Sequence, residues 1–372
     1  MAGLSAENQL RDVYNMRIVS NLAQRIKGVY AEFDEQGFCR AIEADLEGLG
    51  FGERSSLIRN ALKNHLPNDF ERSAQKLMDS LEPELDDQPG ETPWDGFIVV
   101  PETEYIAQEG IDHFNLGMEA LKEMTKRFSS EGAIRTFIER YPEESLALLR
   151  VWVADPNVHV RRLVSEGTRP RLSLAAPLHS FKNDPGPVLE LLEMQKDDPE
   201  LYVRRSVANN LNDISKDNPA IVVSTLQEWS QDDSEERQWL TRHALRTLLK
   251  QGNEDALGLL GYLAPGITDA ELELEDGWVP REGDLEFVFK FVSERAQKLM
   301  IDYRIHYMKS NGKQAPKTFK WSIRDVGAGD SVVIARKQSF KTISTRKHYP
   351  GSHRVEVVVN GHTMAEAEFV CD

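Results

Sequence analysis

A repeated segment in the middle of the chain constrains the fold more than any other feature. DPNVHVRR (155–162) returns as DPELYVRR (198–205), 43 residues later, and a weaker third copy begins at Asp233 and includes LTRH (240–243). Helix pairs repeated with a period near 40 are typical of HEAT-type solenoids. The repeat therefore predicts an α-solenoid.

Each copy also predicts where a helix begins. An aspartate at the N-cap accepts from free backbone N–H groups, and a proline at the first helical position lacks only a donor that would stay unpaired. We therefore expect Asp155 and Asp198 to be N-caps, with partner helices before them over 143–153 and 186–195. Apolar residues three and four apart predict further helices before residue 80, and 86–96 is predicted to be a linker.

The end of the chain has a different pattern. Residues 267–283 are acidic and contain Gly and Pro, which predicts a boundary. Beyond it, apolar and polar residues alternate, as in an antiparallel sandwich, in the segments 300–309, 318–326, 331–339 and 353–361. We predict a mainly α protein with a HEAT-like α-solenoid over residues 1–270 and a small antiparallel β-sandwich over residues 280–372.

The charge is unevenly distributed along the chain. A formal net charge of −16 argues against general nucleic-acid binding, because phosphate contacts need Lys and Arg. Residues 285–372, however, contain 15 Lys and Arg against 9 Asp and Glu, a net charge of +6. The C-terminal domain is therefore predicted to be basic enough to bind an anionic partner.

Several classes of protein are not indicated. Cys39 and Cys371 are the two cysteines, so neither a disulfide framework nor a cysteine-ligated zinc site is expected. The sequence contains no phosphate-binding glycine loop, GxSxG, HExxH or Cys/His metal spacing, and we expect no cofactor and no metal. The sequence has no apolar run long enough for a membrane span and no secretory signal pattern, so we expect a cytoplasmic protein. We also expect a monomer.

Paired arginines are the first candidates for a functional surface. If the second helix of each repeat lines the inner face, the arginines form a basic stripe suited to the phosphates of a duplex. The stripe consists of Arg161, Arg162, Arg204, Arg205, Arg242 and Arg246. The alternative is structural, with Arg161 and Arg204 each pairing with the preceding aspartate.

Two glutamates are candidates for chemistry. Gly167 is a natural helix stop, which puts Glu166 in the last helical turn, at the negative end of the helix dipole. That unfavourable position indicates a function for Glu166, the alternative being an i,i+4 pair with Arg162. Glu131 follows two serines at a helix start, where an ordinary capping role is available.

Three strings, at 125–137, 155–172 and 339–361, resemble the AlkC branch of the AlkC/AlkD DNA alkylation-repair glycosylase superfamily. SEGTRPRL (165–172) and STRKHYPG (344–351) are the most specific parts. The resemblance implies a C-terminal immunoglobulin-like domain that helps to grip DNA. It also implies excision of cationic N3-alkylated bases, such as 3-methyladenine and 3-methylcytosine, without a metal or cofactor.

Carried onto this chain, the resemblance implies that Glu131 and Glu166 are the active-site carboxylates, with Asp213 as a weaker candidate. The family string usually continues RPRLPW, whereas Leu174 stands here in place of the aromatic residue that would stack near the lesion. This departure concerns rate and substrate range. The predicted DNA contacts of the helical domain are Arg162, Arg169, Arg171, Arg205 and Arg242.

Basic residues also gather around Tyr349-Pro350-Gly351 in the C-terminal domain. A loop of this composition between strands is predicted to clamp DNA, the alternative being a solvated sandwich face. Its predicted DNA contacts are Lys341, Arg346, Lys347 and His348, with Lys337 and Arg354 nearby.

The resulting hypothesis is a monofunctional DNA-alkylbase glycosylase whose partner is alkylated DNA. Two alternatives remain, a non-catalytic HEAT-repeat scaffold and a DNA-binding family member without glycosylase activity. The arginine stripe, the position of Glu166 and the SEGTRPR string favour the enzyme.

Overall fold

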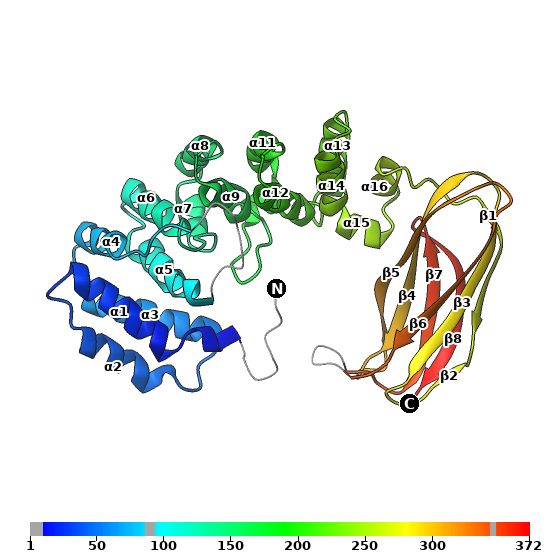
Figure 1. Ribbon diagram of the computed structural model, residues 1–372, viewed down its shortest axis with the longest axis horizontal. Coiled ribbons are helices and arrows are strands. Elements are labelled where there is room, and N and C mark those ends of the chain that lie inside the picture. Colours follow the sequence, from blue (N-terminus) through cyan, green and yellow to red (C-terminus); the bar gives the residue numbers. More distant parts are fainter. Residues whose placement is uncertain (1–9, 86–93, 343–346) are drawn as a thin grey trace. The chain divides into compact units, whose positions relative to one another are not determined.

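The computed structural model describes residues 10–85, 94–342 and 347–372 (Figure 1). The chain divides into two compact units. The first comprises Met1–Asn218 with Asp232–Ala244, and the second comprises Pro219–Gln231 with Leu245–Asp372. Among the described residues, no helix has the length and hydropathy needed to cross a bilayer.

The first unit is helical. Its N-terminal part contains η1 (Leu10–Val13), α1 (Met16–Val29), α2 (Glu35–Leu46), α3 (Phe51–His65) and α4 (Phe70–Asp79). The middle part contains η2 (Trp94–Ile98), α5 (Val99–Glu109), α6 (Phe114–Thr125), α7 (Ile134–Arg140) and α8 (Pro142–Trp152). The last part contains α9 (Val158–Gly167), α10 (His179–Asn183), α11 (Gly186–Gln195), α12 (Leu201–Ile214) and α14 (Glu235–Ala244).

These helices form the predicted solenoid. In Figure 1, α8 and α11 lie in one row, and their chain partners α9 and α12 lie in a second row. Helix α12 packs against α9 on one side and α14 on the other. Val160 and Leu163 of α9 and Val203 and Val207 of α12 are buried, so each helix contributes an apolar face to a core shared by neighbouring repeats.

The predicted helix starts are wrong by a few residues. Helix α9 begins at Val158, and its N-cap is Asn157, whose side chain accepts from two backbone N–H groups. Helix α12 begins at Leu201 without a side-chain cap. The two aspartates instead form ion pairs with other elements, Asp155 with Lys122 at 2.6 Å and Asp198 with Arg161 at 2.7 Å. Each aspartate also accepts from the backbone N–H two residues further on, that of Asn157 or Glu200, just before the helix begins.

The second unit contains three helices and two sheets. Its helices are α13 (Pro219–Trp229), α15 (Arg246–Gln251) and α16 (Glu254–Leu259). One sheet has the order β1-β3-β6 and the other β2-β8-β7-β4-β5. The strands are β1 (Ile267–Leu274), β2 (Trp278–Val279), β3 (Asp284–Ser293), β4 (Gln297–Met308), β5 (Gln314–Val326), β6 (Ser331–Ser339), β7 (Gly351–Val359) and β8 (His362–Cys371).

The sandwich confirms the predicted fold class. All neighbouring strands are antiparallel except β2 and β8, which are parallel. Aromatic residues from both sheets fill the core, among them Phe287, Tyr303 and Phe369. Residues 267–279, which we expected to be a boundary, form β1 and β2, because the acidic residues of β1 alternate with Leu272 and Leu274, which pack on the core.

Candidate active site

Glu131 lies in the turn between α6 and α7. Neighbouring Ser130 is buried and fixes this turn: its hydroxyl donates to the carbonyl of Leu121 at 2.7 Å, and its backbone N–H donates to the Thr125 hydroxyl at 3.1 Å. The Glu131 carboxylate accepts from the Ser129 hydroxyl at 2.8 Å and from Arg162 at 2.6 Å. The capping interpretation of Glu131 is wrong, because α7 begins only at Ile134 and the carboxylate is bound by an arginine from α9.

Glu166 lies in the last turn of α9, as predicted, and its side chain is 6% exposed. It accepts from Arg169 at 2.6 Å and from the Ser206 hydroxyl at 2.6 Å, and Arg162 lies 3.4 Å away. Burial alone would raise the pKa of Glu166, but Arg162, Arg169 and Ser206 outweigh burial and hold this pKa below its ordinary value. Glu166 is therefore a buried carboxylate that stays ionised at neutral pH.

Asp213 on α12 is the third predicted carboxylate, and its side chain is 1% exposed. It accepts from Arg169 at 2.8 Å and from Lys216 at 2.8 Å. Because Arg162 contacts Glu131 and Glu166, and Arg169 contacts Glu166 and Asp213, the three carboxylates are linked through two arginines. We call this row the charge chain; its members are Glu131, Arg162, Glu166, Arg169, Asp213 and Lys216.

The arginines of the charge chain are held firmly. Burial would lower the pKa of Arg162, but Glu131 and Glu166 raise this pKa above its ordinary value. The Arg162 guanidinium also lies over the Tyr202 ring, 5.2 Å from its centroid. Arg162 and Arg169, predicted as phosphate contacts, are thus paired with carboxylates, and their contact with DNA remains a prediction.

The loop at 168–178, between α9 and α10, borders the charge chain. Arg135 of α7 donates to the carbonyls of Arg169 and Ala176 in this loop and to that of Gly167, which directly precedes the loop. At the tip, Leu174 is 81% exposed and has a φ of 63°, a left-handed backbone conformation that costs a leucine free energy. An exposed apolar side chain in a strained conformation is a feature that folding alone does not favour.

Besides Arg162, which belongs to the charge chain, and Arg246, which is half-buried, the predicted arginine stripe separates into two groups. Arg161 pairs with Asp198, and Arg204 donates to the carbonyls of Asp198 and Pro199. These two arginines have the structural role that we gave as the alternative, although Arg161 pairs with the following aspartate rather than the preceding one. Arg205 and Arg242 are exposed.

Arg171, the remaining predicted phosphate contact of the helical unit, is exposed and forms a bidentate pair with Asp217 at 2.6 and 2.7 Å. This pair lies at the protein surface, where solvent weakens ion pairs. Arg171 therefore keeps a guanidinium that a phosphate could reach.

The predicted clamp of the second unit is only partly described. Lys341 and Lys347 are exposed, whereas Arg346 lies outside the described residues. The His348 ring is half-buried and packs against the rings of Phe340 and Tyr307, with centroids 4.9 and 5.3 Å apart. This packing gives the His348 ring a structural role against the sandwich core.

The nearby basic residues of the sandwich are engaged in ion pairs. Lys337 pairs with Asp284 and Glu286, and Arg354 pairs with Glu356 and Glu366. Both therefore fit the solvated sandwich face that we gave as the alternative.

Four residues that surround the charge chain were not predicted from the sequence, namely Ser129, Arg135, Tyr202 and Ser206. Ser129 and Arg135 lie in the string that contains Glu131, and Tyr202 and Ser206 lie in or beside the second DPELYVRR copy. The repeat period was the available signal. Ser206 follows Glu166 by 40 residues and Asp213 follows Arg169 by 44, so each lies about one repeat further along the chain than its partner.

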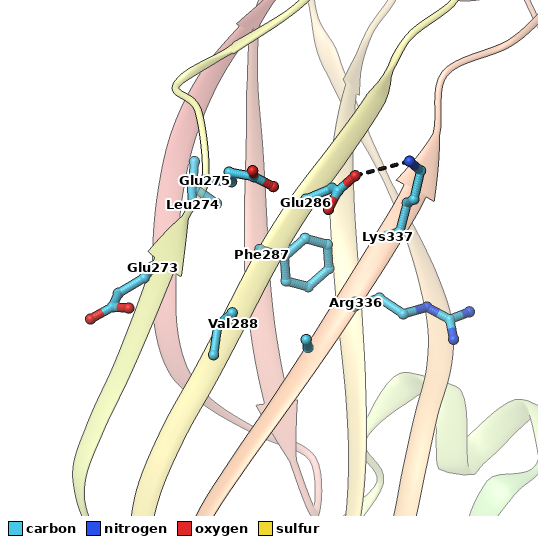
Figure 2. Close-up of a pocket in the computed structure, with 9 residues that line it drawn as sticks. Glu273, Leu274, Glu275, Glu286, Phe287, Val288, Arg336 and Lys337 are labelled. Atoms are coloured by element: carbon cyan, nitrogen blue, oxygen red, sulfur yellow. Dashed lines mark hydrogen bonds and ion pairs between the residues drawn. The ribbon is translucent and has the colours of Figure 1, made fainter.

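A hollow of about 510 Å³ lies on the β1-β3-β6 sheet of the second unit (Figure 2). Its lining includes Glu273, Glu286 and Lys337, and Lys337 is paired with Glu286 at 2.9 Å. No member of the charge chain lines this hollow. Within the described residues, no group of three His, Cys, Asp or Glu side chains is arranged to hold a metal ion.

Fold and site together define a HEAT-like helical-repeat protein with a carboxylate-centred site and an immunoglobulin-like C-terminal domain. A family described as "DNA alkylation repair enzyme" matches residues 118–250, which include the charge chain. A second, described as "Uncharacterised protein YhaZ, C-terminal Ig-like domain", matches residues 268–371. The chain belongs to the DNA alkylation repair enzyme family.

Two known proteins are similar over nearly the whole chain. The "Uncharacterized protein YhaZ" of Bacillus subtilis (strain 168) is 35% identical over 365 residues, which is 97% of this chain and 99% of YhaZ. The solved structure of the Pseudomonas fluorescens alkylpurine DNA glycosylase AlkC, bound to DNA containing an abasic site analog, is also 35% identical. It matches with a TM-score of 0.88 and covers 98% of this chain and 100% of that chain.

Proposed function

We propose that this protein is a DNA glycosylase that hydrolyses the N-glycosidic bond of cationic N3-alkylated bases, such as 3-methyladenine and 3-methylcytosine. The observation that carries the proposal is Glu166, a buried carboxylate kept ionised by two arginines and a serine. The similarity to AlkC, a glycosylase seen bound to DNA with an abasic site analog, supports the same assignment.

The chemistry suits a site that offers fixed negative charge. An N3-alkylated base is positively charged, so it departs as a neutral molecule when the electron pair of the C1′–N bond moves onto it. Positive charge then develops on the deoxyribose, and a preorganised carboxylate stabilises it. Such electrostatic stabilisation contributes about 3–4 kcal/mol, or a factor of roughly 10²–10³ in rate. Water adds its oxygen to C1′ and gives up a proton, so the reaction is a hydrolysis.

The three carboxylates differ in accessibility, and we assign their roles accordingly. The Glu131 side chain is 28% exposed, so it is the carboxylate best able to face the sugar and orient the water. The Glu166 side chain is 6% exposed and contributes negative charge from a largely water-free position. Asp213 holds Arg169 and Lys216 and is too buried to meet the substrate, so it positions the others.

Binding of alkylated DNA would use the exposed cations of both units. Arg205 and Arg242 of the first unit and Lys341 and Lys347 of the second are exposed and suited to phosphate contacts, which position DNA without reading its sequence. Such binding weakens as salt concentration rises. We propose that the protein acts as a monomer on alkylated DNA without a cofactor.

Base release from methylated DNA tests the proposal, with wild type and Glu166→Gln compared in the same assay. We expect wild type to release 3-methyladenine or 3-methylcytosine, and Glu166→Gln to be slower by a factor of about 10² or more. Uracil, a neutral leaving group, should be released far more slowly than either cationic base. Comparable release of uracil would contradict the mechanism. Binding of DNA without any base release would favour the alternative, a family member that has lost activity.

A further inference from the structure

Arg135 of α7 has contacts that the charge chain does not explain. Its side chain is buried, with 4% of the residue exposed, and within the described part of the chain it forms no ion pair. Instead it donates to the Gly167 carbonyl at 3.0 Å, to the Arg169 carbonyl at 2.7 Å, and twice to the Ala176 carbonyl, at 2.6 and 3.0 Å. Burial lowers the pKa of Arg135 to about 10, so it remains a cation at neutral pH.

These three carbonyls lie at both ends of the 168–178 loop. Gly167 is the last residue of α9, where backbone carbonyls lack helical partners and a cation is favourable. Arg169 follows on the outgoing limb, and Ala176 lies on the returning limb. The loop closes on itself through the bond from the Leu178 N–H to the Pro170 carbonyl. One guanidinium therefore holds the end of α9 and both limbs of the loop together.

The residue before Arg135 contacts the same helix end. A Cβ atom on Gly167 would lie 2.7 Å from Cγ2 of Ile134, so only glycine allows α9 to approach α7 this closely. Ile134 and Arg135 thus fix the backbone at Gly167, directly after Glu166, and Arg135 also fixes the backbone at Arg169. Since Glu131 lies just before α7, this short helix connects the backbone of Glu131 to that of Glu166.

We propose that Arg135 is a positioning residue that fixes the 168–178 loop and thereby the distance between Glu131 and the Glu166–Arg169 pair. An arginine is required because its planar fork offers several donors in fixed directions, whereas a lysine ammonium is a single point. The effect on rate rests on the proposed glycosylase function, but the effect on the loop does not.

The experiment compares Arg135→Gln and Arg135→Lys with Arg140→Gln, an exposed arginine on the same helix. Trypsin reports on the loop, because the bond after Arg171 can be cut whereas the bond after Arg169 precedes a proline. We expect cleavage after Arg171 to be about tenfold faster in both Arg135 variants, with kcat for base release lower by a factor of about ten or more. KM and the Kd for duplex DNA containing an abasic-site analogue should change less than about threefold.

A purely structural role would instead speed proteolysis throughout the chain, so cleavage sites in the sandwich and far-UV circular dichroism are recorded alongside. If Arg135→Gln does not fold, Arg135→Lys, which keeps the charge, carries the test. Normal loop cleavage and normal kcat in Arg135→Lys would overturn the proposal. If wild type releases no base, the proposed function fails, and the loop cleavage still decides whether Arg135 holds the loop.

Discussion

Two buried glutamates of the helical unit, Glu102 in α5 and Glu166 in α9, differ in the direction of their pKa shifts. Glu102 is fully buried in the first turn of its helix, at the positive end of the dipole, and Glu166 lies in the last turn, at the negative end. The dipole alone would therefore keep Glu102 ionised and disfavour ionisation of Glu166. The opposite is found: the pKa of Glu102 is raised and that of Glu166 is lowered.

The number of hydrogen-bond partners explains the reversal. Glu102 has one weak partner, Arg25 at 3.5 Å, and its Oε1 atom accepts no hydrogen bond from the described residues, so burial dominates. Glu166 has close contacts to Arg169 and Ser206. A hydrogen bond to a charged group contributes about 1.5–3 kcal/mol, against about 0.3–1 kcal/mol for the helix dipole. The comparison shows that an ionised buried carboxylate requires several donors held in place.

The largest expected effect comes from removing the arginine of each glutamate. Arg169→Met leaves both Glu166 and Asp213 without their shared cation, and we expect it to lower the free energy of unfolding by about 3–5 kcal/mol. Arg25→Met should cost less, about 1–2 kcal/mol, because the contact between Arg25 and Glu102 is long, at 3.5 Å. Urea denaturation of both variants at neutral pH measures the difference. Equal losses would mean that the two glutamates are not distinguished by their arginines.

The next effect is a difference in pH dependence between Glu166→Gln and Glu102→Gln. Because the folded-state pKa of Glu166 lies below the ordinary value of 4.5, its ionised form stabilises the protein above that value, and the stabilisation is lost as pH falls through the folded-state pKa. Glu166→Gln should therefore be less stable than wild type at pH 7, by about 1.5–3 kcal/mol. The difference should shrink in acid.

Glu102 has the opposite sign. Because its pKa is raised, the stability linked to its protonation is present below the ordinary value and is lost as pH rises through the folded-state pKa. Glu102→Gln should thus match or exceed wild type in stability at pH 7, with little difference in acid. Thermal unfolding of the three proteins from about pH 2 to about pH 8 measures both trends, because the Glu166 stabilisation is lost only below the ordinary value of 4.5. Parallel curves for the two variants would contradict the assigned pKa directions.

The parts of the fold that depend on local periodicity could be predicted from the sequence. The repeat at 155 and 198 indicated the helix pairs, and alternation indicated β4 to β7. The helix starts could not be predicted, because Asp155 and Asp198 are engaged by cations from other elements. Strand β1 was missed since its acidic residues hid the alternation with Leu272 and Leu274.

The site could be predicted as a set of residues but not as a network. The resemblance implies that Glu131, Glu166 and, more weakly, Asp213 are active-site carboxylates, and the structure links the three through Arg162 and Arg169. Their partners come from the neighbouring repeat, and nothing local in the sequence marks Ser206 as a donor to Glu166. Whether Arg169 contacts a carboxylate or a phosphate likewise depends on how the helices pack, and this packing cannot be read from the sequence near Arg169.

The glycines at the ends of α5 and α9, Gly110 and Gly167, can be compared in the same way, with a smaller expected effect on the free energy of unfolding. A Cβ on Gly110, after α5, would meet the Phe70 ring at 2.1 Å, and one on Gly167 would meet Ile134 at 2.7 Å. Gly110→Ala and Gly167→Ala should each lower the free energy of unfolding by about 1–3 kcal/mol, because both sites are already filled. Only Gly167→Ala should slow base release, since of these two glycines only Gly167 adjoins the charge chain. The exposed Gly28→Ala in α1, with no atom near its Cβ, is the control, and a slowed Gly110→Ala would contradict the distinction.

The smallest expected effect concerns Leu174, at the tip of the loop that Arg135 holds. The left-handed conformation of Leu174 costs about 1–2 kcal/mol, and Leu174→Gly removes this cost. Because glycine also makes the unfolded chain more flexible, we expect a smaller net gain, of about 0.5–1 kcal/mol in the free energy of unfolding. Val151, the penultimate residue of α8, is similarly exposed but helical, and Val151→Gly should lose about 0.3–0.5 kcal/mol, because glycine is a weaker helix former than valine. Chemical denaturation of the two variants measures both changes. Weaker binding of DNA with an abasic-site analogue by Leu174→Gly than by Val151→Gly would mean that the strained leucine contacts DNA. Equal binding by the two variants would mean that Leu174 has no role in DNA recognition.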